Sequence, residues 1–290
     1  MAQAMSGAAH SANGPAAISP TDLNVLATIA ADEGGLSIST DKVEFLVARL
    51  SGQLTRLGLA DFSEYAAYMR RDGTQQDKRL FIEALTTHTT SFFRERPQYD
   101  WMRDKALPAM LEEGAGTRRP FEVWSAACST GAELYSALML IANLRPKDQS
   151  PLLMRGVGTD LSHAILKRGK LGVYTKEEID GIPVELRRRF LLSSRDGADR
   201  YRIGPDLRKQ ATWTQANLTR AGDVGSISAD IAFLRNVLIY FDAETRDRVL
   251  RNVIGRISPG GYLLTGHSET IDARSYGLTS IRPSIYHKER

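Results

Sequence analysis

The residues with the clearest chemical potential form a turn of small side chains between an apolar strand and a helix. The stretch Phe121–Leu144 opens with an apolar run that predicts a buried strand, and from Glu133 it has the spacing of an amphipathic helix. Between the two, Ser125–Gly131 contains only Ser, Ala, Cys, Thr and Gly. Little side-chain bulk then separates a ligand from the backbone amides at the helix N-terminus. We therefore expect a ligand to bind at this turn.

An acidic residue further along the chain indicates what kind of ligand this is. The segment MRGVGTD ends in Asp160, where a second parallel strand would finish, and α/β folds place an acid there against ribose hydroxyls. The turn lacks the GxGxxG phosphate fingerprint, which favours a nucleoside without phosphates. S-adenosylmethionine fits that description. An ordinary strand-to-helix turn remains the alternative at this point.

Composition narrows the class of protein. The 290 residues are 42% hydrophobic, enough for a substantial core. The net charge of +4 is too small to indicate nucleic-acid binding. A single cysteine, Cys128, excludes an internal disulfide and a cysteine-cluster metal site, so we expect no metal and a cytoplasmic location. No run is long and apolar enough to span a membrane, and no signal peptide is evident.

The chain divides by pattern into a tail and two domains. Residues 1–17 have the composition of a disordered tail. Residues 18–95 show four short helical patterns, which predict a small all-α domain. Residues 96–290 alternate strand and helix, which predicts an α/β domain with a parallel sheet. This alternation breaks at about residues 189–213, where we expect a small antiparallel β insertion.

Four segments together resemble the CheR-type family of chemotaxis-receptor glutamate methyltransferases. They are ALTTHTTSFFRE (84–95), VWSAACSTGAELYS (123–136), FLRNVLIYF (233–241) and GGYLLTGHSE (260–269). Their order and spacing cover nearly the whole chain outside the tail. The resemblance implies a Rossmann-like α/β methyltransferase domain that uses S-adenosylmethionine and releases S-adenosylhomocysteine, with a small antiparallel β insertion and a preceding all-α domain. It also implies that chemoreceptor cytoplasmic domains are the substrate.

The resemblance also implies which residues contact the cofactor. By position in the family's motifs these are His88, Thr90, Arg94, Glu133, Asp160, Asn217, Leu218, Arg235 and Asn236. Two positions depart from the family's pattern, because His88 replaces an asparagine and Ala132 replaces the first acid of an STGEE motif. A histidine still donates a hydrogen bond, so we expect cofactor binding to survive.

The expected chemistry requires positioning rather than a base. A glutamate side chain is already ionised at neutral pH, because its reference pKa is about 4.3. The protein must align the carboxylate oxygen with the methyl carbon and remove water. We assign Arg94 and Tyr240 to hold the carboxylate, as catalytic residues. His267 is interpreted as a structural hydrogen-bonding residue and Cys128 as a small filler.

Two other functions remain open from the sequence alone. The chain could be a methyltransferase of another substrate class, although its helical domain argues against this. It could also be a weakly catalytic or non-catalytic relative that binds the cofactor as a regulatory module, an interpretation that rests on His88 and Ala132. We further expect the β insertion to bind a receptor C-terminal tail by adding a strand to its edge.

Overall fold

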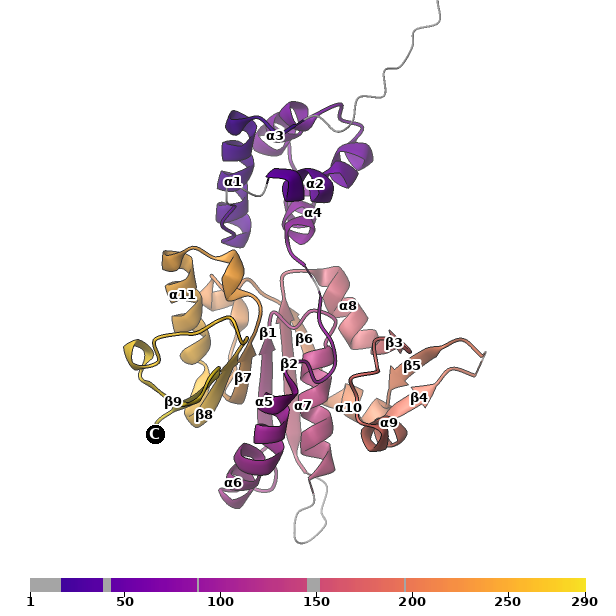
Figure 1. The fold of residues 1–290 in the computed structure, drawn as a ribbon, viewed down its shortest axis with the longest axis vertical. Coiled ribbons are helices and arrows are strands. Elements are labelled where there is room, and N and C mark those ends of the chain that lie inside the picture. Colours follow the sequence, from indigo (N-terminus) through magenta and orange to yellow (C-terminus); the bar gives the residue numbers. More distant parts are fainter. Residues whose placement is uncertain (1–16, 39–42, 88, 145–151, 196) are drawn as a thin grey trace, which may run out of the picture. The chain divides into compact units, whose positions relative to one another are not determined.

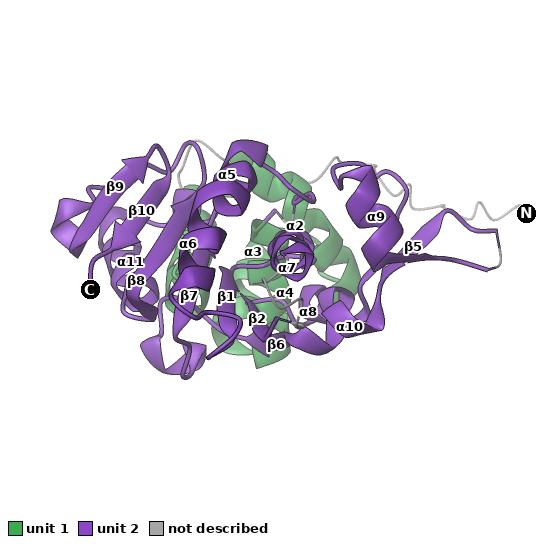
Figure 2. Ribbon diagram, turned by 90° about the horizontal axis from the view of Figure 1, so that it is seen from below, with its two compact units in different colours: residues 1–86 green, residues 87–290 purple. Residues whose placement is uncertain are grey.

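The computed structural model describes residues 17–38, 43–87, 89–144, 152–195 and 197–290. The chain forms two compact units, residues 1–86 and 87–290 (Figure 2). Except for its last residue, the tail expected at residues 1–17 lies outside the described ranges. The unit boundary was expected after Glu95 but falls after Thr86, because Phe92 and Phe93 are buried in the core of the second unit.

The first unit consists of helices that begin at polar caps. Its helices are α1 (Pro20–Gly34), α2 (Val43–Leu57), α3 (Phe62–Arg71) and α4 (Gln75–Leu85). The side chains of Ser19, Asp61 and Thr74 accept backbone N–H groups from the first turns of α1, α3 and α4. Such a cap contributes about 1 kcal/mol, because the first amides of a helix lack partners within it.

Large side chains that are shielded from water hold these helices together. Helix α1 packs on α3 and α4, and α2 packs on α4. Leu26, Leu50, Tyr65 and Phe81 are at most 1% exposed. Burial of each such side chain stabilises the unit by about 1.5–3 kcal/mol, which is how four short helices form a stable bundle.

The second unit is built on a seven-stranded sheet in the order β6-β2-β1-β7-β8-β10-β9. Its strands are β1 (Phe121–Ala126), β2 (Met154–Asp160), β6 (Ala211–Gln215), β7 (Ala229–Leu234), β8 (Ile257–Thr265), β9 (Leu278–Arg282) and β10 (Ile285–Lys288). The first five strands in the sheet order pair in parallel, and β10 runs antiparallel to both neighbours. The carboxyl ends of the parallel strands therefore meet at one edge.

Helices cover both faces of this sheet. They are α5 (Arg96–Trp101), α6 (Leu107–Glu112), α7 (Ala132–Asn143), α8 (His163–Leu171), α10 (Pro205–Gln210) and α11 (Ala243–Ile254), with a π-helical segment η2 (Met102–Ala106) and short 3-10 turns η3 (Ala221–Val224), η4 (Leu238–Tyr240) and η5 (Arg274–Tyr276). In Figure 1, α5 and α7 lie over β1 and β2. Alternation along β1 sends Val123 into the core around α7 and Trp124 into the core around α11.

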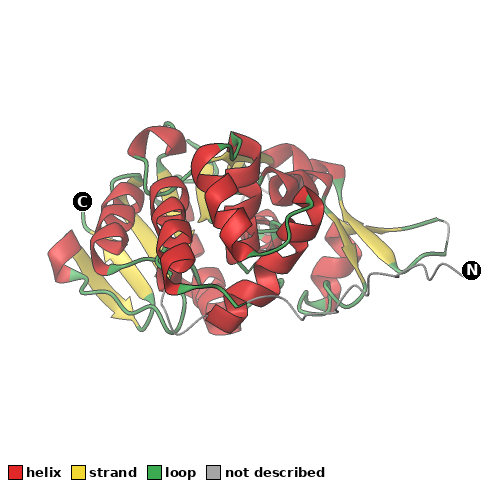
Figure 3. Ribbon diagram, turned by 90° about the horizontal axis from the view of Figure 1, so that it is seen from above, coloured by secondary structure: helices red, strands yellow, loops and turns green. Residues whose placement is uncertain are grey.

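A separate three-stranded antiparallel sheet forms the insertion. Its strands β3 (Val173–Thr175), β4 (Leu191–Ser193) and β5 (Arg200–Ile203) have the order β3-β5-β4, and α9 (Val184–Phe190) lies between β3 and β4 in the chain. β4 and β5 project as a hairpin (Figure 3). The insertion was expected at about residues 189–213. Instead, β3 joins it by pairing with β5, whereas Trp213 lies in β6 of the main sheet, paired with Gly158.

Candidate functional site

The turn after β1 is held open by backbone conformations that side chains rarely adopt. Ala127, Ser129 and Gly131 have φ angles of 60°, 49° and 86°. A β carbon on Gly131 would also lie 2.4 Å from the Trp213 ring, so only glycine fits there. The N–H of Cys128 donates to the Thr159 carbonyl at 2.8 Å, which fixes the turn against β2. Strain of this kind persists where a site requires a particular backbone path.

Asp160 is the last residue of β2, as the sequence predicted, and its side chain joins this strand to the turn after β1. Its carboxylate accepts the N–H of Ser129 at 2.9 Å and the N–H of Ser162 at 3.0 Å. The residue is 7% exposed. β1 lies between β2 and β7, where the strand order reverses, and open α/β sheets bind their ligands beside such a point.

A buried arginine joins two glutamates at the carboxyl edge of the sheet. Arg235 follows β7, and its guanidinium lies 3.1 Å from the Glu133 carboxylate and 3.1 Å from that of Glu95. The second oxygen of Glu133 accepts the Ser125 hydroxyl at 2.6 Å. Burial raises the pKa of Glu133, and the charge of Arg235 opposes that rise. The pairing joins α7, β7 and the segment before α5.

The segment that precedes α5 brings the two predicted catalytic residues to the same edge. The Tyr240 hydroxyl contacts the Thr87 hydroxyl and accepts the Thr87 N–H at 3.3 Å. The Arg94 side chain donates to the Thr89 carbonyl at 3.0 Å, and the Arg94 carbonyl accepts a hydrogen bond from Arg235 at 2.6 Å. Both side chains thus contact one short segment. They do not contact one another in the described part of the chain.

The other predicted contacts are distributed around this edge. Thr90 is half-buried, and His88 lies outside the described residues. Asn217 and Leu218 follow β6 and are buried, and the Asn217 amide oxygen accepts the Thr219 N–H and hydroxyl at 3.0 and 2.8 Å. Asn236 follows β7 with a φ of 57°.

Two acidic residues were given no role by the sequence reasoning. Glu95, with a φ of 60°, contacts Arg235 and accepts the His267 N–H at 3.2 Å. Glu269 is 1% exposed and accepts three backbone N–H groups. Both glutamates stand in quoted motifs, SFFRE and GHSE, so their place in those motifs was the available signal.

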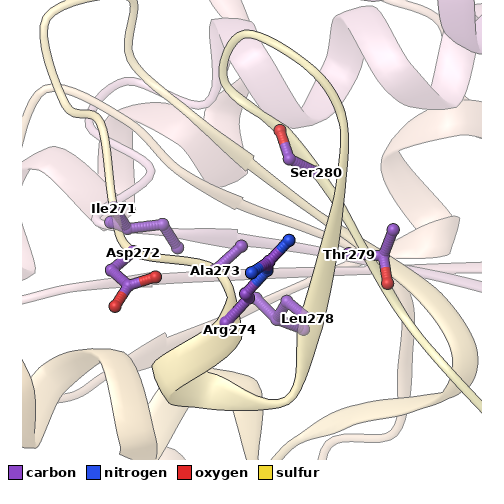
Figure 4. A pocket seen from close by; sticks show the side chains of 7 residues that line it. All are labelled: Ile271, Asp272, Ala273, Arg274, Leu278, Thr279 and Ser280. Atoms are coloured by element: carbon purple, nitrogen blue, oxygen red, sulfur yellow. The ribbon is translucent and has the colours of Figure 1, made fainter.

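The hollow drawn in Figure 4 is formed by other residues. It is lined by residues 271–274, in the loop between β8 and β9, and by residues 278–280 of β9, and Arg274 lies near its centre (Figure 4). None of its lining residues belongs to the carboxyl edge described above. In the described ranges, no group of three or more His, Cys, Asp and Glu side chains is placed to hold a metal ion. No described helix is long and apolar enough to cross a membrane.

The sheet order, the strained turn after β1 and the acid after β2 define a nucleoside-binding α/β domain. Residues 88–284 match the family model "CheR methyltransferase, SAM binding domain", and residues 21–86 match "CheR methyltransferase, all-alpha domain". The chain belongs to the CheR methyltransferase family. It is an S-adenosylmethionine-dependent methyltransferase, with a small all-α domain followed by the α/β domain, as the resemblance implied.

Curated relatives are similar in sequence to this chain over most of their length. "Chemotaxis protein methyltransferase 2" of Pseudomonas aeruginosa is 32% identical over 87% of this chain and 87% of its own. "Chemotaxis protein methyltransferase" of Borreliella burgdorferi is 29% identical over 93% of this chain and 95% of its own. The protein of the same name from Klebsiella aerogenes is 30% identical over 84% of this chain and 85% of its own.

The residues at the carboxyl edge fit S-adenosylmethionine. The cofactor has ribose hydroxyls and an amino-acid end that carries one positive and one negative charge. When bound, it supplies a methyl group activated by a sulfonium. Asp160 ends β2, at the position where α/β folds place an acid against ribose hydroxyls. Within the described ranges, the buried Arg235 Nε has no hydrogen-bond partner. Unused polar capacity of this kind at a site is consistent with a charged ligand.

Proposed function

We propose that this protein transfers the methyl group of S-adenosylmethionine to glutamate side chains on the cytoplasmic domains of chemoreceptors. The products are glutamyl methyl esters and S-adenosylhomocysteine, and the reaction takes place in the cytoplasm. The observation that carries the proposal is the match of both domains, including the all-α domain, to relatives named chemotaxis methyltransferases. Each ester removes one negative charge, which would shift a receptor between signalling states and so support chemotactic adaptation.

In this proposal the cofactor is held by residues that follow β1, β6 and β7, by the last residue of β2, and by the segment before α5. Asp160 binds the ribose hydroxyls, because its carboxylate is fixed by two backbone N–H groups at the end of β2. Arg235 and Glu133 provide the charged groups around the amino-acid end of the cofactor. The further contacts are Thr90, Arg94, Asn217, Leu218, Asn236 and His88, the last of which is proposed from the sequence alone.

The transfer step requires a carboxylate placed in line with the methyl group and shielded from water. We propose that Arg94 and Tyr240 hold this carboxylate, the first by charge and the second by its hydroxyl. Their shared contact with the segment at Thr87 and Thr89 supports the assignment, because it places both residues on one structural support. No proton has to be removed from an ionised glutamate, so the proposal assigns no general base.

The small sheet is proposed to bind a receptor C-terminal tail as an added strand. Among the described residues, β4 pairs with β5 alone, so its other edge has unused backbone groups. Leu192 on β4 is 54% exposed beside a hollow that Val173 and Tyr201 also line. An exposed edge beside an apolar hollow is the arrangement that strand addition uses.

A pull-down with peptides from receptor C-termini tests the tail proposal. The Leu192→Asp variant should lose binding, while Leu153→Asp, at a site 51% exposed elsewhere in the unit, should keep it. Equal capture by both variants would remove the small sheet from the proposal.

Label transfer tests the main proposal. Methyl-labelled S-adenosylmethionine is incubated with membranes that contain the host's chemoreceptors, and the product is then treated with mild alkali. We expect base-labile label on the receptors, lost in Arg94→Ala. A protein that binds S-adenosylhomocysteine normally but labels no receptor would contradict the enzyme reading and favour the regulatory module that His88 and Ala132 leave open.

A further inference from the structure

Glu269 is a buried carboxylate whose partners are all backbone amides. It lies in the turn after β8 and is 1% exposed. Its Oε2 accepts the N–H of Asn236 at 2.6 Å and that of Gly266 at 2.9 Å, and its Oε1 accepts the N–H of Leu238 at 2.8 Å. Hydrogen bonds to an ionised acceptor are roughly twice as strong as neutral ones, so this carboxylate strongly constrains the amides around it.

Two of these amides belong to the loop that leaves β7. Asn236 has a φ of 57°, so its N–H cannot continue the ladder of the sheet. Leu238 begins the 3-10 turn η4, which ends at Tyr240. The N–H of Tyr240 in turn donates to the Val237 carbonyl at 3.2 Å, inside the same turn. Among the residues that the structure describes, Glu269 is the one partner of the Asn236 and Leu238 N–H groups.

The backbone at Gly266, after β8, also approaches the Glu269 carboxylate closely. A β carbon on Gly266 would lie 2.6 Å from Glu269 Oε2 and 3.0 Å from the Asn236 side-chain amide nitrogen. Only glycine allows that approach. The ends of β7 and β8, which are neighbouring parallel strands, therefore meet at one carboxylate.

We propose that Glu269 is a positioning residue that sets the conformation of the loop carrying Asn236 and Tyr240. It acts through Asn236 on cofactor affinity and through Tyr240 on turnover, and in this it rests on the roles that the proposed function gives those two residues. Glu269 has no contact with substrate in this scheme. Its carboxylate replaces the sheet partners that the β7 loop gives up when it turns away.

The test is the Glu269→Gln variant, measured in the full chain. A glutamine keeps the shape but has one acceptor oxygen, and its NH₂ group would face a backbone N–H. We expect affinity for S-adenosylhomocysteine, measured by calorimetry, to fall about fivefold to tenfold, in the range of one typical hydrogen bond. In a double-mutant cycle with Asn236→Ala, the two losses should be clearly less than additive, because Glu269 acts on the cofactor through the Asn236 side chain that the second change removes.

Asp230→Asn is the matched control. Asp230 is also buried, at 2% exposure, and accepts the Glu122 N–H at 2.8 Å, but it lies at the opposite end of β7. It should lower the melting temperature and leave S-adenosylhomocysteine affinity unchanged. Glu269→Gln affinity equal to wild type, or fully additive losses with Asn236→Ala, would overturn the proposal. If Glu269→Gln does not fold, Gly266→Ala displaces the carboxylate instead and should give the same loss of affinity.

Binding of S-adenosylhomocysteine requires no receptor, so this result does not depend on the identity of the methyl acceptor. A failure of receptor labelling would leave the affinity test intact, and a failure of the affinity test would leave the label-transfer result intact. Each of the two proposals can therefore be refuted without refuting the other.

Discussion

The guanidinium of Arg235, after β7, lies 3.1 Å from the carboxylate of Glu133, in the first turn of α7. The Arg235 side chain is 2% exposed and also lies 3.1 Å from Glu95. One positive charge thus holds two carboxylates and, through the Arg94 carbonyl, the segment proposed to hold the substrate. Removal of one partner from a buried ion pair is costly, because the remaining charge has no water to replace it.

Arg235→Met should therefore destabilise the second unit by about 3–5 kcal/mol and abolish S-adenosylhomocysteine binding. Arg235→Lys should also lose affinity, since an ammonium lacks the fork that spans Glu133, Glu95 and the Arg94 carbonyl. Thermal unfolding and calorimetry measure both effects. Arg251→Lys is the control, because that arginine forms an exposed pair with Asp247 and should leave both stability and affinity nearly unchanged. Wild-type affinity in Arg235→Lys would contradict the prediction.

Asp160→Asn should weaken S-adenosylhomocysteine binding about tenfold or more while leaving the fold intact. An amide has one acceptor oxygen, so it cannot accept the N–H groups of both Ser129 and Ser162 in the present geometry. Calorimetric titration gives the affinity. The control is Asp180→Asn, because the Asp180 side chain is 69% exposed. The two variants should differ clearly in their affinity for S-adenosylhomocysteine. Similar affinities in both would remove Asp160 from the cofactor site.

Tyr240→Phe and Thr87→Val should each lower kcat for methyl transfer about tenfold, with cofactor affinity unchanged within about twofold. Each removes one hydroxyl from the contact between the two residues. Steady-state kinetics with receptor-containing membranes and calorimetry with S-adenosylhomocysteine separate turnover from binding. Tyr276→Phe, which loses a hydroxyl bonded to Asp247 at 3.0 Å, is the control and should keep full activity. Loss of affinity rather than kcat would assign Tyr240 to the cofactor.

Gly169→Ala should destabilise the second unit by about 1–3 kcal/mol, although alanine normally favours a helix by up to about 1 kcal/mol. A β carbon at Gly169 would lie 2.6 Å from the Trp213 ring, so overpacking exceeds the gain in propensity. Gly52→Ala in α2 is the control, because nothing lies within 4 Å of its β carbon and the change should be stabilising. Thermal unfolding shows whether each variant is more or less stable than the wild type. A stabilised Gly169→Ala protein would contradict the packing argument.

Asp77→Asn should destabilise the first unit by about 1–3 kcal/mol at pH 7 and by less near pH 3. The Thr74 hydroxyl, together with Arg56 and the Tyr68 hydroxyl, holds the pKa of Asp77 well below its usual range. Because the folded pKa is the lower one, the stabilisation is complete above the unfolded pKa of about 3.9 and is lost as pH falls towards the folded pKa.

All three tryptophans lie in the second unit, so their fluorescence does not report on the first unit. Hydrogen exchange of α4 measures the effect instead. Asp61→Asn, which changes the cap of α3 instead of that of α4, is the control and should affect α4 protection less than Asp77→Asn does. A wild-type protein whose α4 protection is the same at pH 7 and pH 3 would contradict the role of Asp77.

Local sequence determined the elements and the chemistry of their ends. The small-residue turn after β1 and the position of Asp160 at the end of β2 could both be predicted, because each depends on residues only a few positions apart. Together with the family motifs, they also indicated an α/β domain and its cofactor.

Only the tertiary structure decided which distant groups meet. The pairing of β3 with β5, the place of Trp213 in β6 and the contacts of Arg235 and Glu269 all join segments far apart in the chain. Periodicity shows which face of an element is buried but not what covers it, and a buried charge finds its partner through the fold. The sequence thus identified Glu133 and Arg235 separately, and the sheet order brought them together.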